Sequence, residues 1–193
     1  MRIYPIQSHH LQEVMKLHQN NLTDISASFG TVYLRQMYTS LLSDTNTHIF
    51  LGAFNNNNLI GMLIASNDIH TSFQQIKPHM SLETVLSTIM ALLSGKIAIG
   101  RIFRRIIFEK KITSYMNRKD TYILILVIDN QFRRRRVATK LFHALLQRKP
   151  SSVMWVDAKH SDKAALKFYT NIGFIKHLDY YNTVLLRRYA RVG

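Results

Sequence analysis

Apolar and polar positions in the first 65 residues follow two periods, and their order predicts a strand, two helices and a strand hairpin. Residues 2–6 alternate as a strand does, whereas apolar residues within 11–22 and 34–41 recur at helical spacing. Residues 48–54 and 59–65 are apolar runs of strand length. Because the four asparagines 55–58 separate these runs, we expect a β-hairpin there.

The second half of the chain contains a strand, a basic turn and a helix in direct succession. The uninterrupted apolar run 123–128 is typical of a strand buried on both faces. A turn at 129–131 and four arginines, Arg133–Arg136, come next, and Val137 opens a helical pattern. This order directs backbone N–H groups and the positive end of a helix at one place, which suits a phosphate group.

The C-terminal part continues with short elements. We expect a fifth strand at 153–158 and an amphipathic helix at 161–172, which Ser161 or Asp162 can cap and Gly173 can end as its C′ residue. Two more strands are expected, at 174–178 and 183–187.

Two stretches resemble motifs of the GCN5-related N-acetyltransferases (GNAT). In motif A of that family, a strand is followed by Arg/Gln-x-x-Gly-x-Gly/Ala and a helix. Arg133 matches the first position and Ala138 the last, while Arg136 stands where glycine is usual. Residues 162–174 resemble the family's Asn-x-x-Ala-x-x-x-Tyr-x-x-x-Gly-Phe helix, with Asp162 in place of Asn. The two motifs occur in the family's order and at its separation.

The resemblance is specific over about 121–175, is looser back to residue 1, and implies a mixed α/β fold. We expect the GNAT fold, a seven-stranded, mostly antiparallel, V-shaped sheet flanked by helices, in one domain spanning 1–193. Residues 66–120 lie outside the family's minimal pattern, and we interpret them as a helical insertion between the third and fourth strands. It should contain one helix over 82–93 and another with Ile99, Ile102, Phe103 and Ile106 on one face and Arg101, Arg104 and Arg105 opposite.

Composition adds a strong positive charge. Twenty-six Lys and Arg against eleven Asp and Glu give a net charge of +15, which attracts nucleic acid, acidic lipid or a phosphorylated cofactor. The chain has no cysteine, which excludes disulfides, Cys-ligated zinc and thiol catalysis. This, with an N-terminus that lacks an apolar core, favours a cytoplasmic location. The nine histidines show no metal-ligand spacing, so we predict no metal site.

The basic helix expected at 96–108 has two interpretations. A basic amphipathic helix can make peripheral contact with an anionic membrane. We favour the other interpretation, in which the helix packs its apolar side on its own domain. The apolar stretch 84–94 is shorter than the roughly 20 residues that a membrane span needs.

By resemblance, the phosphates of acetyl-CoA lie on the turn Arg133–Arg136 and on the first helical residues Val137, Ala138 and Thr139. Arg134 and Arg136 replace two glycines that let the backbone approach the phosphates. Three interpretations are open. The guanidinium groups add charge-assisted contacts, or their bulk has spoiled the loop, or the turn is a solvated basic surface. We favour the first, because the pattern from Val137 onward is intact.

The resemblance also implies how the rest of the donor is held. The fourth and fifth strands of the family splay apart, and the pantetheine amides pair with free backbone groups, here those of Leu126, Val127 and Ile128. Asp162 replaces an asparagine that touches the cofactor, or it only caps its helix. Tyr169 matches the tyrosine beside the cofactor sulfur and is the candidate acid for the leaving thiolate, for which a normal phenol pKa of about 10 suffices. The alternative is a core aromatic.

The general base is harder to place. Many relatives carry a glutamate early in the fourth strand, where this chain has Tyr122 and Ile123. Asp157, a lone acid in the apolar fifth strand, is therefore the candidate base, acting through water. The alternative is a strand-end carboxylate that pairs with an arginine.

The resemblance thus predicts an acetyl-CoA-dependent N-acetyltransferase that moves an acetyl group directly to a primary amine of a small molecule, peptide or protein. The arginines of 66–120 suggest an acidic or phosphorylated acceptor, and the family often dimerises, so a homodimer is open. Nucleic acid is not the expected partner, because aromatics are not interleaved with the arginines. The alternative is a catalytically inactive, basic binding module of the same fold for nucleic acid or an anionic surface.

Overall fold

A seven-stranded sheet forms the centre of the molecule, in the strand order β1-β2-β3-β4-β5-β7-β6. The computed structural model describes residues 1–22, 29–76, 99–117, 119–150 and 152–190. Neighbouring strands run antiparallel except for β4 and β5, which are parallel. The mixed α/β fold and the mostly antiparallel sheet are therefore as predicted. That residues 1–193 form one domain stays a prediction.

The strands begin and end within two residues of the predicted positions. They are β1 Arg2–Pro5, β2 His48–Asn55, β3 Asn58–Ser66, β4 Thr121–Ile128, β5 Met154–Lys159, β6 Ile175–Tyr180 and β7 Thr183–Arg188. The helices are α1 Leu11–Asn21, α3 Thr31–Ser43, α4 Ile69–Ile76, α6 Ile99–Tyr115, α7 Val137–Arg148 and α8 Lys163–Asn171, with short 3-10 turns η1 Ser8–His10 and η2 Asn130–Phe132. The sequence did not predict α4, and the helix expected at 82–93 lies outside the described residues.

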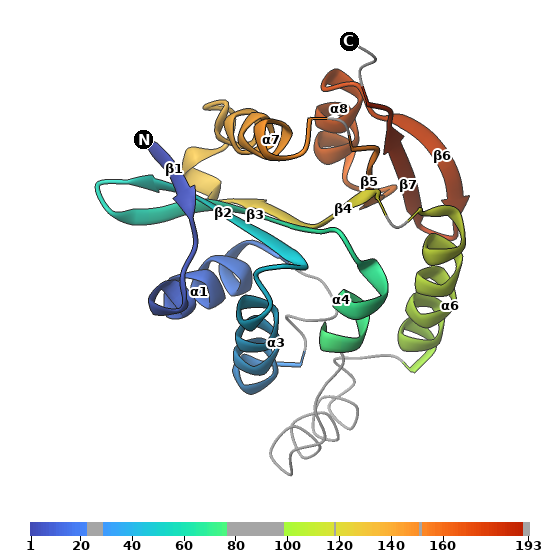
Figure 1. The fold of residues 1–193 in the computed structure, drawn as a ribbon, viewed down its shortest axis with the longest axis horizontal. Coiled ribbons are helices and arrows are strands. Elements are labelled where there is room, and N and C mark those ends of the chain that lie inside the picture. The colour runs from blue at the N-terminus through green and yellow to red at the C-terminus, as the bar shows by residue number, and fades with distance from the viewer. Residues whose placement is uncertain (23–28, 77–98, 118, 151, 191–193) are drawn as a thin grey trace.

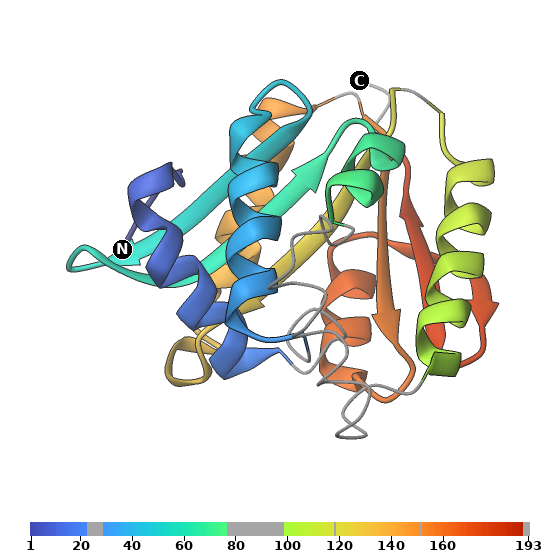
Figure 2. The ribbon, with the colours of Figure 1, turned by 90° about the horizontal axis from the view of Figure 1, so that it is seen from below.

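Helices cover both faces of the sheet. Figure 1 shows α7 and α8 on one face and α1, α3, α4 and α6 on the other, and Figure 2 views that second face with β4 and β5 between α3 and α6. Apolar residues of α7 and α8 join the first face in one core cluster. On the second face, α1 and α3 pack on β2 and β3, whereas α4 and α6 pack on the starts of β4 and β5.

Two local features of β2 and β3 follow from residue type. Asn56 and Asn57 have φ values of 48° and 64°, as a type I′ hairpin turn requires, so the predicted hairpin is confirmed. Gly61 lies opposite Ile128, where a Cβ would come within 2.7 Å of Ile128 Cδ1 and 3.3 Å of the Val127 carbonyl oxygen. The absence of a side chain at Gly61 therefore lets the end of β4 lie close to β3.

The insertion between β3 and β4 contributes α4 and α6 as described helices. Among the residues of α6 whose side chains are described, Phe108 and Ile112 are buried, and Phe108 stacks on Tyr180 with ring centroids 5.5 Å apart. The predicted positions of Ile99, Ile102 and Phe103 lie outside the described side chains. Ile106, which the sequence placed on the apolar face, is 41% exposed. The predicted inward position of Ile106 is wrong because Phe108 and Ile112 fill the space against the sheet. None of the described helices has the length and apolar character of a membrane span.

Candidate active site

A fork between β4 and β5 divides the sheet. The two strands share three residue pairs, Thr121 with Met154, Tyr122 with Trp155 and Ile123 with Val156. Directly after the last pair, β4 carries a bulge at Leu124, because Ile64 lies opposite Ile125 and Ala65 opposite Ile123. A bulge increases the local twist and ends pairing. The strands therefore diverge from Leu124 onward, which gives the predicted V shape.

Beyond the fork, one edge of β4 faces the gap. Leu126, Val127 and Ile128 pair with β3, whereas the pairing with β5 has already ended at Ile123. About half of the backbone N–H and C=O groups of such a strand point away from its one partner. The three residues predicted to offer backbone groups thus lie where an extended ligand could pair with them.

The arginine turn after β4 keeps the backbone shape of a glycine loop. Arg134 and Arg136 have φ values of 61° and 58°, in the left-handed region that favours glycine. Arg136 is the position at which the quoted motif has glycine, and Arg134 lies two residues before it in the same turn. The backbone conformation of the loop is therefore retained despite the substitutions.

The side chains of the turn point to solvent. All four residues Arg133–Arg136 are exposed, and no described carboxylate forms an ion pair with them. Arg133 Nε lies 3.4 Å from the Ile128 carbonyl oxygen, and the guanidinium of Arg135 lies 5.4 Å from the Phe132 ring centroid. The four arginine side chains are thus largely accessible to solvent rather than packed into the core.

The first turn of α7 presents unbonded amides beside the arginines. The first helical hydrogen bond runs from Lys140 N to the Arg136 carbonyl oxygen at 3.0 Å, and no side chain caps this helix. The amides of Val137, Ala138 and Thr139 precede that bond, so they are donors without an intrahelical acceptor. Such amides, at the positive end of a helix, are the donors to which an anion can bind, and the binding of phosphate here stays a prediction. The side chain of Val137 is buried in the core.

Tyr169 lies on the α8 side of the fork and is 6% exposed. Its ring contacts those of Phe168 and Phe174, with centroids 5.2 Å and 5.5 Å away. Burial raises the pKa of the Tyr169 phenol above its ordinary value, and the negative charges of Asp157 and Asp162 act in the same direction. The expectation of a normal phenol pKa is therefore wrong, and the hydroxyl stays protonated throughout the neutral range.

Asp162 caps α8. Its Oδ1 accepts a hydrogen bond from the Ala165 amide at 2.9 Å. The capping interpretation is thus confirmed, and a contact of Asp162 with a cofactor stays a prediction.

Asp157 is the first residue of β5 beyond the fork, immediately after Val156. It shares a strand face with Trp155, because residues two apart in a strand point the same way, and Trp155 packs in the cluster of α4 and α6. The Tyr122 hydroxyl donates a hydrogen bond to Asp157 Oδ1. The two candidate catalytic groups, Asp157 and Tyr169, therefore approach the fork from opposite faces of the sheet.

The fold and the motif positions agree with a known family. Residues 12–174 match the model of the Acetyltransferase (GNAT) family. The chain belongs to the GNAT family of acetyltransferases. No curated protein sequence matches it.

Solved structures of GNAT proteins share this fold at low identity. The ribosomal-protein-S18-alanine N-acetyltransferase from Escherichia coli has a TM-score of 0.61 and 10% identity, covering 100% of this chain and 96% of that chain. PaiA N-acetyltransferase from Thermoplasma acidophilum, in complex with coenzyme A, has a TM-score of 0.60 and 13% identity, covering 97% and 98%. Ard1 from Thermoplasma volcanium has a TM-score of 0.60 and 15% identity, covering 99% and 98%.

Two connections around this GNAT fork have no signal in the sequence. Asn21, the last residue of α1, accepts a hydrogen bond from the Asn130 amide at 3.1 Å and so ties α1 to the turn after β4. The sequence marks Tyr122 only as a residue at the position where many relatives have a glutamate. Its partner Asp157 is 35 residues away, in a strand whose register the sequence does not reveal.

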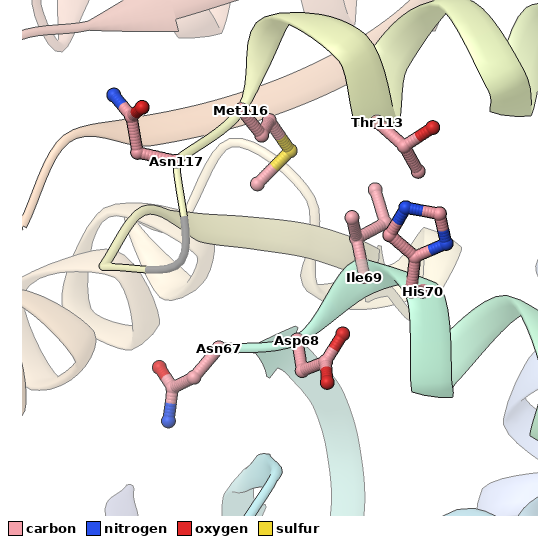
Figure 3. A pocket seen from close by; sticks show the side chains of 7 residues that line it. All are labelled: Asn67, Asp68, Ile69, His70, Thr113, Met116 and Asn117. Atoms are coloured by element: carbon pink, nitrogen blue, oxygen red, sulfur yellow. The ribbon is translucent and has the colours of Figure 1, made fainter.

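A separate pocket of about 460 Å³ lies at the other end of β4, between α4 and α6 (Figure 3). It is lined by Asn67, Asp68, Ile69, His70, Thr113, Met116 and Asn117. Both Asp68 carboxylate oxygens accept hydrogen bonds from Thr71, and Asn67 Oδ1 accepts one from Thr121 Oγ1 at 3.4 Å. The one acid that lines this pocket, Asp68, thus caps the start of α4. The arginine turn is at the opposite end of β4. In the described part of the chain, no three His, Asp or Glu side chains gather as metal ligands would.

Proposed function

We propose that this GNAT protein is an acetyl-CoA-dependent N-acetyltransferase that transfers the acetyl group directly to a primary amine. The observation that carries the proposal is the left-handed arginine turn at the open end of the β4–β5 fork. The proposed anion site and the unpaired edge of β4 both lie at this end of the fork. Together they suit a ligand that carries phosphates at one end and amides along an extended arm.

The donor phosphates are held by the amides of Val137, Ala138 and Thr139 and by the arginine side chains. Arg134 and Arg136 supply the left-handed backbone that glycine usually supplies, and they add two positive charges. A guanidinium forms two parallel hydrogen bonds with a phosphate. Donor binding in this chain should therefore depend on salt more steeply than an uncharged glycine loop would allow.

The amide arm of the donor lies along the open edge of β4. The backbone groups of Leu126, Val127 and Ile128 pair with it as a neighbouring strand would. This places the thioester near the closed end of the fork, between Asp157 and Tyr169.

The chemistry needs one proton acceptor and one proton donor. Asp157 takes a proton from the acceptor ammonium through a water molecule, and the neutral amine forms the C–N bond as the C–S bond breaks. Tyr169 gives its proton to the leaving thiolate, and the second proton, which the nitrogen loses as the amide forms, passes through water to the phenolate and restores the phenol. Burial raises the pKa of this phenol, so Tyr169 is protonated at neutral pH when the next donor binds.

The acceptor enters from the face that carries α1, α3, α4 and α6 (Figure 2). Asp157 lies on that face because it shares a strand face with Trp155, which packs against α4 and α6. The acceptor is an amine of a small molecule, peptide or protein with an acidic or phosphorylated group, which the net charge of +15 would attract. A cytoplasmic location and a homodimer are the remaining parts of the proposal.

Two measurements test it. Calorimetry should show binding of coenzyme A, and a panel of amines and N-terminal peptides with acetyl-CoA should release free thiol. The proposal is wrong if the protein does not bind coenzyme A and instead binds polyanions in a way that added salt abolishes.

A further inference from the structure

Tyr122 is completely buried at the closed end of the fork. It belongs to the second of the three β4–β5 pairs, and its hydroxyl reaches forward to Oδ1 of Asp157, the first residue past the last pair. This hydrogen bond thus spans the two strands at the point where their backbone pairing ends.

The insertion fixes the ring of Tyr122. Phe73 of α4 lies edge-on to it, with centroids 6.1 Å apart and an interplanar angle of 74°. Ile69 of α4 and Ile112 of α6 belong to the same buried cluster. A buried aromatic ring in close packing has one orientation, so the hydroxyl that it carries is fixed in space.

We propose that Tyr122 is the positioning residue for the general base, and that its hydroxyl holds the Asp157 carboxylate at the fork. Many relatives carry this carboxylate in the fourth strand. In this chain the carboxylate is Asp157 of the fifth strand, and Tyr122, at the fourth-strand position, orients it. This inference rests on the proposed acetyl transfer.

The hydrogen bond has a chemical consequence besides orientation. A donor to a carboxylate favours the ionised form, which is the form that accepts a proton. Loss of the Tyr122 hydroxyl should therefore slow proton transfer to Asp157 without weakening donor binding.

The test compares Tyr122→Phe with Tyr38→Phe. Tyr38 is also fully buried and hydrogen-bonded, to His18 Nδ1 at 2.6 Å, but it lies in the α1–α3 cluster. We expect Tyr122→Phe to lower kcat about 10- to 100-fold with little change in the Kd for coenzyme A. Tyr38→Phe should leave both unchanged. In an Asp157→Asn background, Tyr122→Phe should cause no further decrease in kcat.

A second readout does not depend on activity. In protein labelled with ¹³C at aspartate side chains, the carboxylate signal assigned to Asp157 by its loss in Asp157→Asn should change its chemical shift at a fixed neutral pH in Tyr122→Phe and not in Tyr38→Phe. An unchanged signal in Tyr122→Phe, or equal kcat losses in both Tyr→Phe variants, would overturn the positioning role of Tyr122. A wild-type protein that acetylates no amine would instead overturn the proposed function, while the Asp157 signal still reports on the hydrogen bond.

Discussion

The backbone carbonyl of Tyr169 accepts a hydrogen bond from the Phe174 amide at 3.0 Å, and their rings pack with centroids 5.5 Å apart. A second bond joins the Gly173 amide to the Thr170 carbonyl at 3.0 Å, and Gly173 has a φ of 92°. This is a Schellman motif, in which the residue after the glycine packs on the last turn of the helix. The end of α8 therefore fixes the side chain proposed as the acid.

Gly173→Ala should lower the free energy of unfolding by about 1–2 kcal/mol, because alanine is strained at positive φ. Space is not the cause, since the nearest atom to a Cβ there would be Arg188 Nε at 3.6 Å. The variant should also lower the acetylation rate by displacing Tyr169. Gly30→Ala is the matched control, because Gly30 has a φ of 87° and open space but caps α3. Chemical denaturation should show a loss in both variants, and a rate loss in Gly30→Ala as well would exclude a specific effect on Tyr169.

Arg136→Gly should stabilise the protein by about 0.5–1 kcal/mol, because glycine removes the strain of a left-handed arginine. The same change should weaken coenzyme A binding about tenfold at low salt, since one charged donor is lost. Urea unfolding and calorimetry measure the two effects separately.

Arg135→Gly is its control, because Arg135 does not have a positive φ. That variant should lose stability through greater freedom of the unfolded chain. If Arg136→Gly binds coenzyme A as tightly as wild type, the side chain of Arg136 does not contribute to donor binding.

Tyr169→Phe should lower kcat about 10²- to 10³-fold and leave the Kd for coenzyme A unchanged, because only a proton donor is lost. Its stability should be close to wild type near pH 7, since no described residue hydrogen-bonds to the hydroxyl. Thiol release at saturating donor measures the rate. Equal rates for the two proteins would remove Tyr169 from the mechanism.

Tyr169 also has a pH signature. Its pKa is raised in the folded state, so above about pH 10 the unfolded chain holds fewer protons than the folded one, and stability should fall as the pH rises. Tyr169→Phe should reduce this alkaline loss. Thermal unfolding between pH 8 and about pH 11 measures it, and identical slopes would contradict the burial of the phenol.

His48 should make stability depend on mildly acidic pH. It is 3% exposed, with Nδ1 3.0 Å from the Asp44 carbonyl oxygen and Nε2 2.8 Å from Ser72 Oγ. Burial lowers its pKa below 6.5. The unfolded chain therefore takes up a proton first as the pH falls through 6.5, and stability should drop by up to about 1.4 kcal/mol per pH unit until the folded imidazole also protonates.

His48→Gln should flatten this dependence, because glutamine keeps a polar group near Ser72 but does not titrate. Ser72→Ala is the control and should lower stability at every pH without changing the slope. Urea unfolding midpoints between pH 5 and pH 8 measure the pH dependence of stability in each protein. A slope that persists in His48→Gln would assign it to another group.

The sequence predicted the seven strands because their signals are local. The hydrophobic periodicity of each strand, the turn asparagines and Gly173 each determine the local structure within a few residues. It missed α4, whose eight residues are short for a periodic pattern, although Asp68 and Thr71 form a cap at its start. It also placed Ile106 of α6 on the buried face, where the structure has Phe108 packed against Tyr180 instead.

For the candidate site, the positions could be predicted and the contacts could not. The motif located the turn at Arg134 and Arg136, but residue type alone argues against the left-handed backbone found there. The link from Tyr122 to Asp157 depends on the register of two parallel strands, which a long crossover leaves undefined in the sequence.

The three shared pairs of β4 and β5 have a consequence for how the molecule opens. Only this short ladder joins β1–β4 to β5–β7 within the sheet. Amide hydrogen exchange should accordingly divide the sheet into two cooperative units, with the hydrogen bonds of the Ile123–Val156 pair exchanging early. A ligand bound between β4 and β5 beyond their last pair would make the two units exchange as one. Protection of the β5 amides on addition of coenzyme A would therefore show how far the ligand joins the two strands.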